Sequence, residues 1–203
     1  MKNHALIFFG SPGCGKDENS LVAQPMGYHI MNMGPILKRS APPGVIDQIM
    51  EGGLAPDDLV HDLITDNTPE PNPNLRVLYN GVPRSLVQSQ RLVQMLNSLY
   101  QMPITTIFFV VDKEVAFERL ISRGREDDKR MVVLNRLRVY ESYAHEVITH
   151  LRKKTQVIQV DANQELHLVQ AAVKEAIEEE LGKLSSSPKE TAWWVHKDGL
   201  LPA

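Results

Sequence analysis

The sequence predicts an α/β fold in three layers, with a five-stranded parallel sheet between two layers of helices. Short apolar runs of strand length alternate with amphipathic helical segments along most of the 203-residue chain. A glycine-rich turn follows the first apolar run and leads into a helix. This alternation is typical of a parallel sheet with right-handed crossovers, in which ligands bind outside the carboxyl ends of the strands.

The first two strands and the helix between them follow from apolar runs and one proline. Residues 5–9 are all apolar, as expected of a central strand that is covered on both faces. A short helix over residues 17–23 should end before Pro25, because the residue preceding a proline disfavours helical geometry. Residues 28–31 form the second predicted strand.

Prolines and glycines divide the next part of the chain into short pieces. We expect two small helices between residues 34 and 50, interrupted at residues 42–44, and a further helix that starts near residue 56. These pieces are a candidate for a mobile insert. The third strand, residues 76–79, ends at a turn over residues 80–84. The helix after that turn should bury Leu86, Leu92, Val93, Leu96 and Leu99.

The second half of the chain continues the alternation. Residues 104–111 are rich in β-branched and aromatic side chains and predict a strand. Asp112 can cap the following helix, and a polar link over residues 124–129 leads into a long helix. Apolar residues of that long helix recur at spacings of three and four: Val133, Leu137, Tyr140, Ala144, Val147 and Leu151. Residues 156–160 are the fifth predicted strand and residues 164–181 the last helix.

The composition limits the partners and the compartment. The 22 Lys and Arg residues nearly balance 25 Asp and Glu residues, so the net charge of −3 gives no general attraction for nucleic acid or for an anionic membrane. The single cysteine, Cys14, excludes an internal disulfide, and no Cys/His cluster has zinc-ligand spacing. With no signal peptide and no membrane span expected, we predict a cytoplasmic protein.

The turn after the first strand has the composition of a phosphate-binding loop. Its glycines allow successive backbone N–H groups to turn toward a polyanion, Lys16 adds a positive charge, and the next helix presents its free N–H groups. The alternative is an ordinary glycine-rich turn with a surface lysine, which the position after a buried strand makes less favourable. The loop consists of Gly10, Ser11, Pro12, Gly13, Cys14, Gly15 and Lys16.

Arginines from separate elements are the second feature that indicates a phosphoryl-transfer site. Phosphoryl transfer depends on positioning and on neutralising charge, so it needs several cations around one site. Taken alone, each arginine is more simply explained as a solvated surface residue. Taken together, these arginines follow the ends of strands or lie in and beside one polar link. They are Arg84, Arg119, Arg123, Arg125 and Arg136.

From residue 4 to about residue 181 the chain resembles adenylate kinases and close nucleoside monophosphate kinases with a short lid. Its loop 10–16 is similar to the phosphate loop of that family. Residues 34–38 are similar to its Gly-Asp-Leu-Leu-Arg segment, and residues 53–56 to its Gly-Leu-Val-Pro segment. Residues 80–88 resemble the highly specific Asp-Gly-Phe-Pro-Arg…Gln block, and residues 118–120, 123–128 and 136–137 resemble the lid and its flanks.

The resemblance implies a P-loop fold with an NMP-binding insert at about residues 33–56 and a lid at about residues 123–129, within one domain that ends near residue 183. ATP would bind to the loop 10–16 and to Arg119, and the lid would close through Asp127 and Asp128. The implied catalytic residues are Lys16, Arg84, Arg123, Arg125 and Arg136. The implied AMP-binding residues are Met33, Gly34, Lys38, Ala55, Gly81, Arg84 and Gln88.

Mg²⁺, as Mg·ATP, is the cofactor that the resemblance implies, while the lid without cysteines implies no zinc. The chain departs from the family around this cation: Glu18 stands where the family has Thr, and Asn80 where it has Asp. The sequence leaves open whether Glu18 supplies a carboxylate to Mg²⁺ or only suits a helix N-terminus. No other side chain is assigned to the metal.

Two functions from different classes follow. The first is a monomeric adenylate kinase, ATP + AMP = 2 ADP, with AMP preferred because Gln88 stands where related pyrimidine-preferring enzymes carry Asn. The second is a nucleotide-binding regulatory module with weak or no turnover, motivated by Glu18, Asn80, Lys38 and Met33; a kinase for another NMP is a variant of the first. Residues 184–203 are expected to be a flexible tail, in which Trp193-Trp194 either packs on the domain or binds a protein partner.

Overall fold

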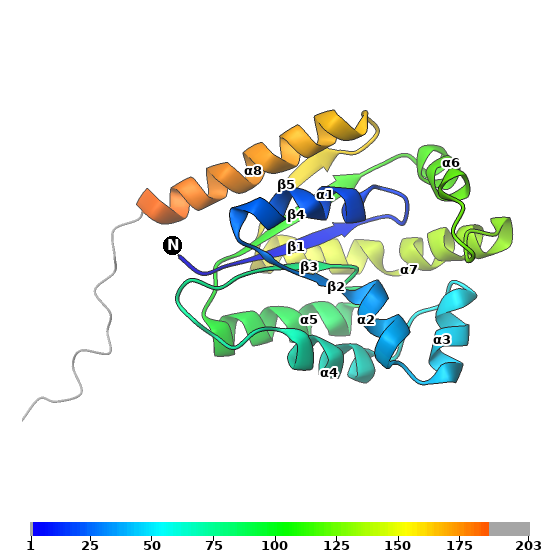
Figure 1. The fold of residues 1–203 in the computed structure, drawn as a ribbon, viewed down its shortest axis with the longest axis horizontal. Coiled ribbons are helices and arrows are strands. Elements are labelled where there is room, and N and C mark those ends of the chain that lie inside the picture. Colours follow the sequence, from blue (N-terminus) through cyan, green and yellow to red (C-terminus); the bar gives the residue numbers. More distant parts are fainter. Residues whose placement is uncertain (1, 187–203) are drawn as a thin grey trace, which may run out of the picture.

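The computed structural model describes residues 2–186 and has the predicted parallel sheet at its centre (Figure 1). The strand order is β2-β3-β1-β4-β5, and every neighbouring pair is parallel. Each strand lies within one or two residues of its expected position. The strands are β1 (His4–Gly10), β2 (His29–Asn32), β3 (Arg76–Asn80), β4 (Ile104–Val110) and β5 (Gln156–Asp161).

Helices cover both faces of the sheet, and α1 packs against α8 on one face while α5 packs against α7 on the other (Figure 1). The insert expected between β2 and β3 contains α2, α3 and α4. The bounds are α1 (Lys16–Ala23), η1 (Gln24–Met26), α2 (Met33–Ser40), α3 (Pro43–Met50), α4 (Asp57–Asn67), α5 (Leu86–Met95), η2 (Leu96–Tyr100), α6 (Lys113–Arg123), α7 (Arg130–Lys154) and α8 (Leu166–Ser186).

Strand β1 lies in the middle of the sheet and is buried along its whole length. Successive side chains of a strand point to opposite faces, so its apolar run supplies both layers of the core. Ala5, Ile7 and Phe9 pack with apolar residues of α4, α5 and α7. Leu6 and Phe8 pack with α1 and α8 on the other face. Burial of each large apolar side chain stabilises the fold by about 1.5–3 kcal/mol. Because β1 is held on both faces, the loop after Gly10 lies at the carboxyl edge of the sheet.

Four details differ from the sequence-based expectation. Leu99 is exposed, because the chain continues α5 as the wider π-turn η2, which rotates Leu99 off the buried face. Asp112 occupies the N-cap position of α6, yet its side chain makes no capping hydrogen bond. The break between the two small helices falls at Ala41 and Pro42 and not at residues 42–44, because Pro43 lacks an N–H that a first turn does not need and so begins α3. Helix α8 continues to Ser186, five residues beyond its predicted end.

Among residues 2–186, no helix is both long and apolar enough to cross a bilayer. The tail beyond residue 186, with Trp193-Trp194, lies outside the described residues.

His4 is a buried polar residue at the start of β1. One of its ring nitrogens is hydrogen-bonded to the Tyr28 hydroxyl and the other to Thr105 Oγ1 at 2.9 Å. Burial, and secondarily the positive charge of Arg76, lowers the pKa of His4 from 6.5 to about 4. The folded protein therefore holds His4 neutral where the unfolded chain would protonate it.

We predict that this histidine makes the protein less stable as the pH falls from 6.5 toward 4. The free energy of unfolding should drop by about 2 kcal/mol more between pH 7 and pH 5 in the wild type than in a His4→Gln variant, because the unfolded state takes up the proton first. Urea unfolding at both pH values measures this difference. His167→Gln, at an exposed site, is the control and should match the wild type. Equal pH dependence in wild type and His4→Gln would contradict the prediction.

Candidate active site

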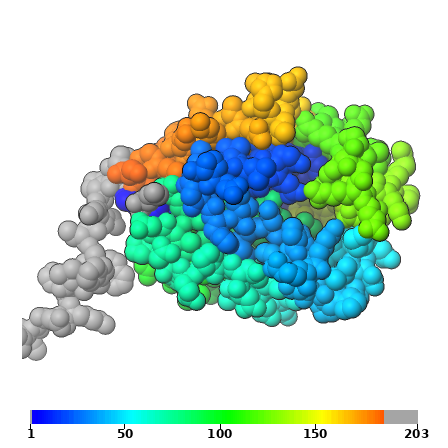
Figure 2. All heavy atoms as spheres, viewed as in Figure 1, coloured from blue at the N-terminus to red at the C-terminus, as the bar shows by residue number. Residues whose placement is uncertain are grey.

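A cavity of about 770 Å³ opens at the carboxyl ends of the strands. Figure 2 shows the corresponding hollow between the N-terminal segment, the insert and the segment that joins α6 to α7. Its walls come from the loop after β1, from α2 and residues 52–54 of the insert, from the turn after β3, and from α6 and α7. This is the place where ligands bind in open parallel sheets.

The loop 10–16 has the backbone that a phosphate site requires. Gly13 has φ +84°, and a Cβ at this position would collide with the backbone carbonyl of Ala116. Gly15, also with φ +84°, is the N-cap of α1 and leaves the first N–H groups of the helix without a side-chain cap. Because these N–H groups and the helix dipole point to one spot, the loop can hold a polyanion.

Lys16 lies folded over the loop. Its ammonium group donates to the carbonyl oxygens of Gly10 at 2.7 Å and Ser11 at 2.9 Å, and it lies 3.2 Å from the sulfur of Cys14. These contacts hold the positive charge at the mouth of the loop, where phosphate oxygens would replace the carbonyls as its partners.

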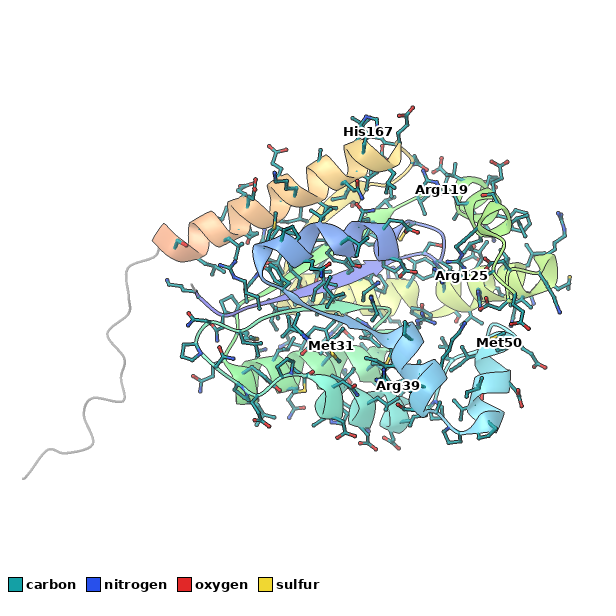
Figure 3. The ribbon with its side chains drawn as sticks, viewed as in Figure 1. Met31, Arg39, Met50, Arg119, Arg125 and His167 are labelled. Carbon is teal, nitrogen blue, oxygen red and sulfur yellow. The ribbon has the colours of Figure 1, made fainter. Side chains whose placement is uncertain are left out.

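Arg84 and Arg119 approach the cavity from opposite sides of the loop. Arg84 follows β3, and its Nε donates to the carbonyl of Gly81 at 2.9 Å. Arg119 on α6 donates to the carbonyls of Ala162 at 2.6 Å and Gln164 at 3.0 Å. Figure 3 shows Arg119 on α6, close to the start of α8. Both guanidinium groups are thus positioned by backbone oxygens.

The segment expected to be the lid, residues 123–129, forms an ion-pair network with α7. Arg123 binds Asp128 through two parallel hydrogen bonds, Nε to Oδ2 at 2.9 Å and Nη2 to Oδ1 at 2.7 Å. Arg136, on α7, pairs with Asp127 and lies 3.4 Å from Asp128. The Asp128 side chain is only 1% exposed, so this two-pronged pair ties the end of α6 to the link that follows it.

The network also sets the charges of its members. Burial alone would raise the pKa values of Asp127 and Asp128, but hydrogen bonds from Arg136 and Arg123 respectively outweigh it and lower both. The hydrogen bonds that Arg123 donates to Asp128 in turn raise the pKa of Arg123. Asp127, Asp128 and Arg123 therefore stay charged at neutral pH.

Arg125 connects the lid to the phosphate loop. Its Nη2 lies 3.1 Å from Oδ2 of Asp17, in the first turn of α1. The other carboxylate oxygen of Asp17 accepts from Asn80 Nδ2 at 2.9 Å, and the same amide nitrogen donates to Asn32 Oδ1 at 2.8 Å. Figure 3 shows Arg125 between the lid segment and the start of α1. Burial would raise the pKa of Asp17, yet these hydrogen bonds and the nearby cations lower it.

Most of the implied AMP-binding residues line the cavity, but two do not. Met33, Gly34, Lys38 and Gly81 are in its wall. Ala55 and Gln88 are buried outside the lining. Gln88 Oε1 accepts from the backbone N–H of Arg84 at 2.7 Å, and Nε2 donates to Asp57 Oδ1 at 2.8 Å.

The structure brings the sequence-derived candidates for phosphate binding together around one cavity. Ser11 and Asp128 stand just behind its lining, where Ser11 contributes its carbonyl and Asp128 its carboxylate. Sequence reasoning did not assign Asp17, Asn32 or Asp57 to the site. Asp17 carried a signal, since it directly follows the loop lysine. Asn32 and Asp57 carried none, because their role comes from contacts with residues 48 and 31 positions away.

The corner between Asp17 and Asn80 fits a hydrated divalent cation. Within the described residues no group of three or more His, Cys, Asp or Glu side chains is placed to enclose a metal ion. Asn80 Oδ1 is nevertheless buried without a hydrogen-bond partner, next to the Asp17 carboxylate. Mg²⁺ takes oxygen ligands and keeps several waters, so it needs only one or two protein oxygens in addition to substrate phosphates.

A glycine-rich loop after a central parallel strand, a lysine over that loop and arginines from three further elements define a P-loop phosphotransferase. A sequence model of the family described as adenylate kinase matches residues 8–156. Similar proteins include an adenylate kinase of Thermus thermophilus, 32% identical over 77% of this chain and 88% of its own length. Adenylate kinases of Synechococcus sp. strain WH7803 (32%, covering 77% and 89%) and Prochlorococcus marinus strain MIT 9301 (27%, covering 86% and 98%) are also similar. The chain belongs to the adenylate kinase family.

Asp128 should be the residue on which the lid depends most. We predict that Asp128→Ala lowers the melting temperature, because it leaves Arg123 partly buried without its two-pronged partner; breaking such buried pairs costs about 3–5 kcal/mol. Differential scanning calorimetry measures the change. Glu126→Ala, at an exposed position two residues earlier, is the matched control and should shift the melting temperature by less than about 1 °C. Equal shifts in the two variants would contradict the role of Asp128.

Proposed function

We propose that the protein is an adenylate kinase that transfers the γ-phosphoryl group of ATP to AMP and yields two ADP. The observation that carries the proposal is the convergence of Lys16, Arg84, Arg123 and Arg136 on one cavity from four separate parts of the chain. Phosphoryl transfer requires two polyanions to approach each other, and cations fixed by surrounding structure offset that repulsion.

In this proposal the loop 10–16 and Arg119 bind ATP, and the acceptor occupies the side of the cavity lined by Met33, Gly34 and Lys38. Arg84 would hold the acceptor phosphate, because its Nε is anchored to Gly81 while the rest of the guanidinium faces the cavity. The lid arginines would surround the transferred group. Bound Mg²⁺ would neutralise ATP phosphate oxygens; a carboxylate at the start of α1 would hold it, and Asn80 Oδ1 would accept a hydrogen bond from one of its waters.

The choice of AMP rests on Gln88. Its amide is oriented by Arg84 N–H and by Asp57, which leaves one N–H and one carbonyl lone pair for another partner. A donor beside an acceptor matches the edge of adenine. A monomeric, cytoplasmic enzyme is part of the proposal and rests on the family and on the single cysteine.

We predict that AMP is phosphorylated by Mg·ATP with a kcat/KM at least about tenfold higher than CMP, UMP or dTMP, since a mismatched polar edge leaves the remaining N–H and lone pair of the Gln88 amide without a partner. A coupled assay of ADP formation with each acceptor measures this. A preference for a pyrimidine acceptor would reject AMP as the substrate. Tight nucleotide binding in calorimetry without turnover of any acceptor would instead favour a regulatory nucleotide-binding module.

The lid arginines provide the second test. Arg123→Ala and Arg125→Ala should each lower kcat at least about a hundredfold while changing the Kd of ATP much less, because their charges act mainly on the group in transfer. Steady-state kinetics and calorimetry on the same preparations separate the two effects. Arg91→Ala removes an exposed arginine that pairs with Asp58 away from the cavity, and it should keep the wild-type kcat. A wild-type kcat in both lid variants would refute the lid role.

A further inference from the structure

Two carboxylates follow the loop lysine, and only the first is held in the site. Asp17 is fixed by Asn80 at one oxygen and by Arg125 at the other, at 2.9 and 3.1 Å. The neighbouring Glu18 is exposed, and among the described residues no hydrogen bond or ion pair holds its carboxylate. Glu18 also lines the cavity, and its backbone carbonyl accepts from Gln170 on α8 at 3.4 Å.

Asn80, beside Asp17, has a buried side-chain oxygen that no hydrogen-bond donor among the described residues satisfies. Its Nδ2 faces two acceptors, the carboxylate of Asp17 and the side-chain oxygen of Asn32, so the orientation of the amide is determined by its neighbours. Asn80 is 3% exposed, lines the cavity, and has an Oδ1 atom with no partner. A buried carbonyl oxygen without a donor is unfavourable, and a cation or a water, including a water bound to a cation, can satisfy it.

We propose that Asp17 is the cation-binding carboxylate of this site, which makes the loop select Mg·ATP and reject metal-free ATP. The proposal rests on the proposed nucleotide-binding function. A carboxylate in the first turn after the loop lysine stands beside the phosphate site, so it repels a bare triphosphate. Mg²⁺ between them reverses the sign of that interaction, and Asn80 Oδ1 is placed to accept from a water of its shell.

Arg125 links the segment after α6 to this corner. It is the cation that forms an ion pair with Asp17, across a distance of 3.1 Å. A metal ion that takes over this role releases the Arg125 guanidinium for phosphate oxygens. One carboxylate thus links cation binding to the position of a lid arginine.

The test is the affinity for ATP with excess Mg²⁺ and with EDTA, measured by calorimetry in the absence of AMP. In the wild type, Mg²⁺ should tighten ATP binding at least about tenfold. Asp17→Asn keeps the size of the side chain and an acceptor for Asn80. It should bind metal-free ATP about tenfold more tightly than the wild type does, and Mg²⁺ should then improve its affinity by less than about threefold. Asp17→Ser is a second variant that removes the charge and should behave in the same way.

Glu18→Gln distinguishes the two carboxylates, and it should keep the metal dependence of the wild type. Loss of that dependence in Glu18→Gln but not in the Asp17 variants would overturn the assignment. ATP affinity of the wild type that is equal with and without Mg²⁺ would also overturn it and leave the proposed phosphotransferase function standing. No ATP binding in either condition would overturn both proposals. Electron paramagnetic resonance with Mn²⁺ in place of Mg²⁺ should give a bound-ion signal with ATP in the wild type and a much weaker one in Asp17→Asn.

Discussion

Burial of β1 on both faces fixes the remainder of the architecture. Its alternate side chains supply the core under α1 and α8 and the core under α5 and α7. The chain leaves this strand at a fixed point and direction, so the loop that begins at Gly10 has little freedom to move. The strands β3 and β4 flank β1 in parallel, and they bring the Arg84 turn and the start of α6 to the same edge. The site is therefore a consequence of sheet order.

Charge balance is the second constraint. Three arginines in and beside the lid would repel one another in a cavity without ligand, and three aspartates prevent this. Arg123 pairs with Asp128, Arg136 with Asp127, and Arg125 with Asp17. These three ion pairs hold the segment 123–129 against α1 and α7. Phosphate oxygens of a nucleotide would replace the aspartates as partners of the arginines. The free-energy cost of moving these arginine side chains therefore stays small.

The corner around Asn80 is where the chain departs from the family pattern. The resemblance implies an aspartate at the end of β3, where this chain has a neutral amide. That amide donates to Asp17, which follows the loop lysine at the start of α1. The corner therefore still contains one carboxylate, and it has moved from the strand to the helix. The parallel register, which sets Asn32 beside Asn80, keeps the amide oriented.

The amino-acid sequence alone was enough to establish the α/β class, the order of the five strands along the chain and the positions of Lys16 and the arginines, because apolar runs, glycines and charged residues act locally. It also identified the family through short blocks of residues. Its periodicity argument failed at Leu99, where a single π-turn changes the face of the helix. Which carboxylate is held at the site became clear only from the folded chain, because both residues line the cavity but, among the described residues, only the Asp17 carboxylate has hydrogen-bond partners. Asp17 and Glu18 are adjacent and chemically alike, and they differ only in what the fold places beside them: Asn80 and Arg125 beside the carboxylate of Asp17, and Gln170 of α8 beside the backbone of Glu18. Contacts between residues 63 and 108 positions apart leave no mark in a local pattern, so neither could be derived from the sequence.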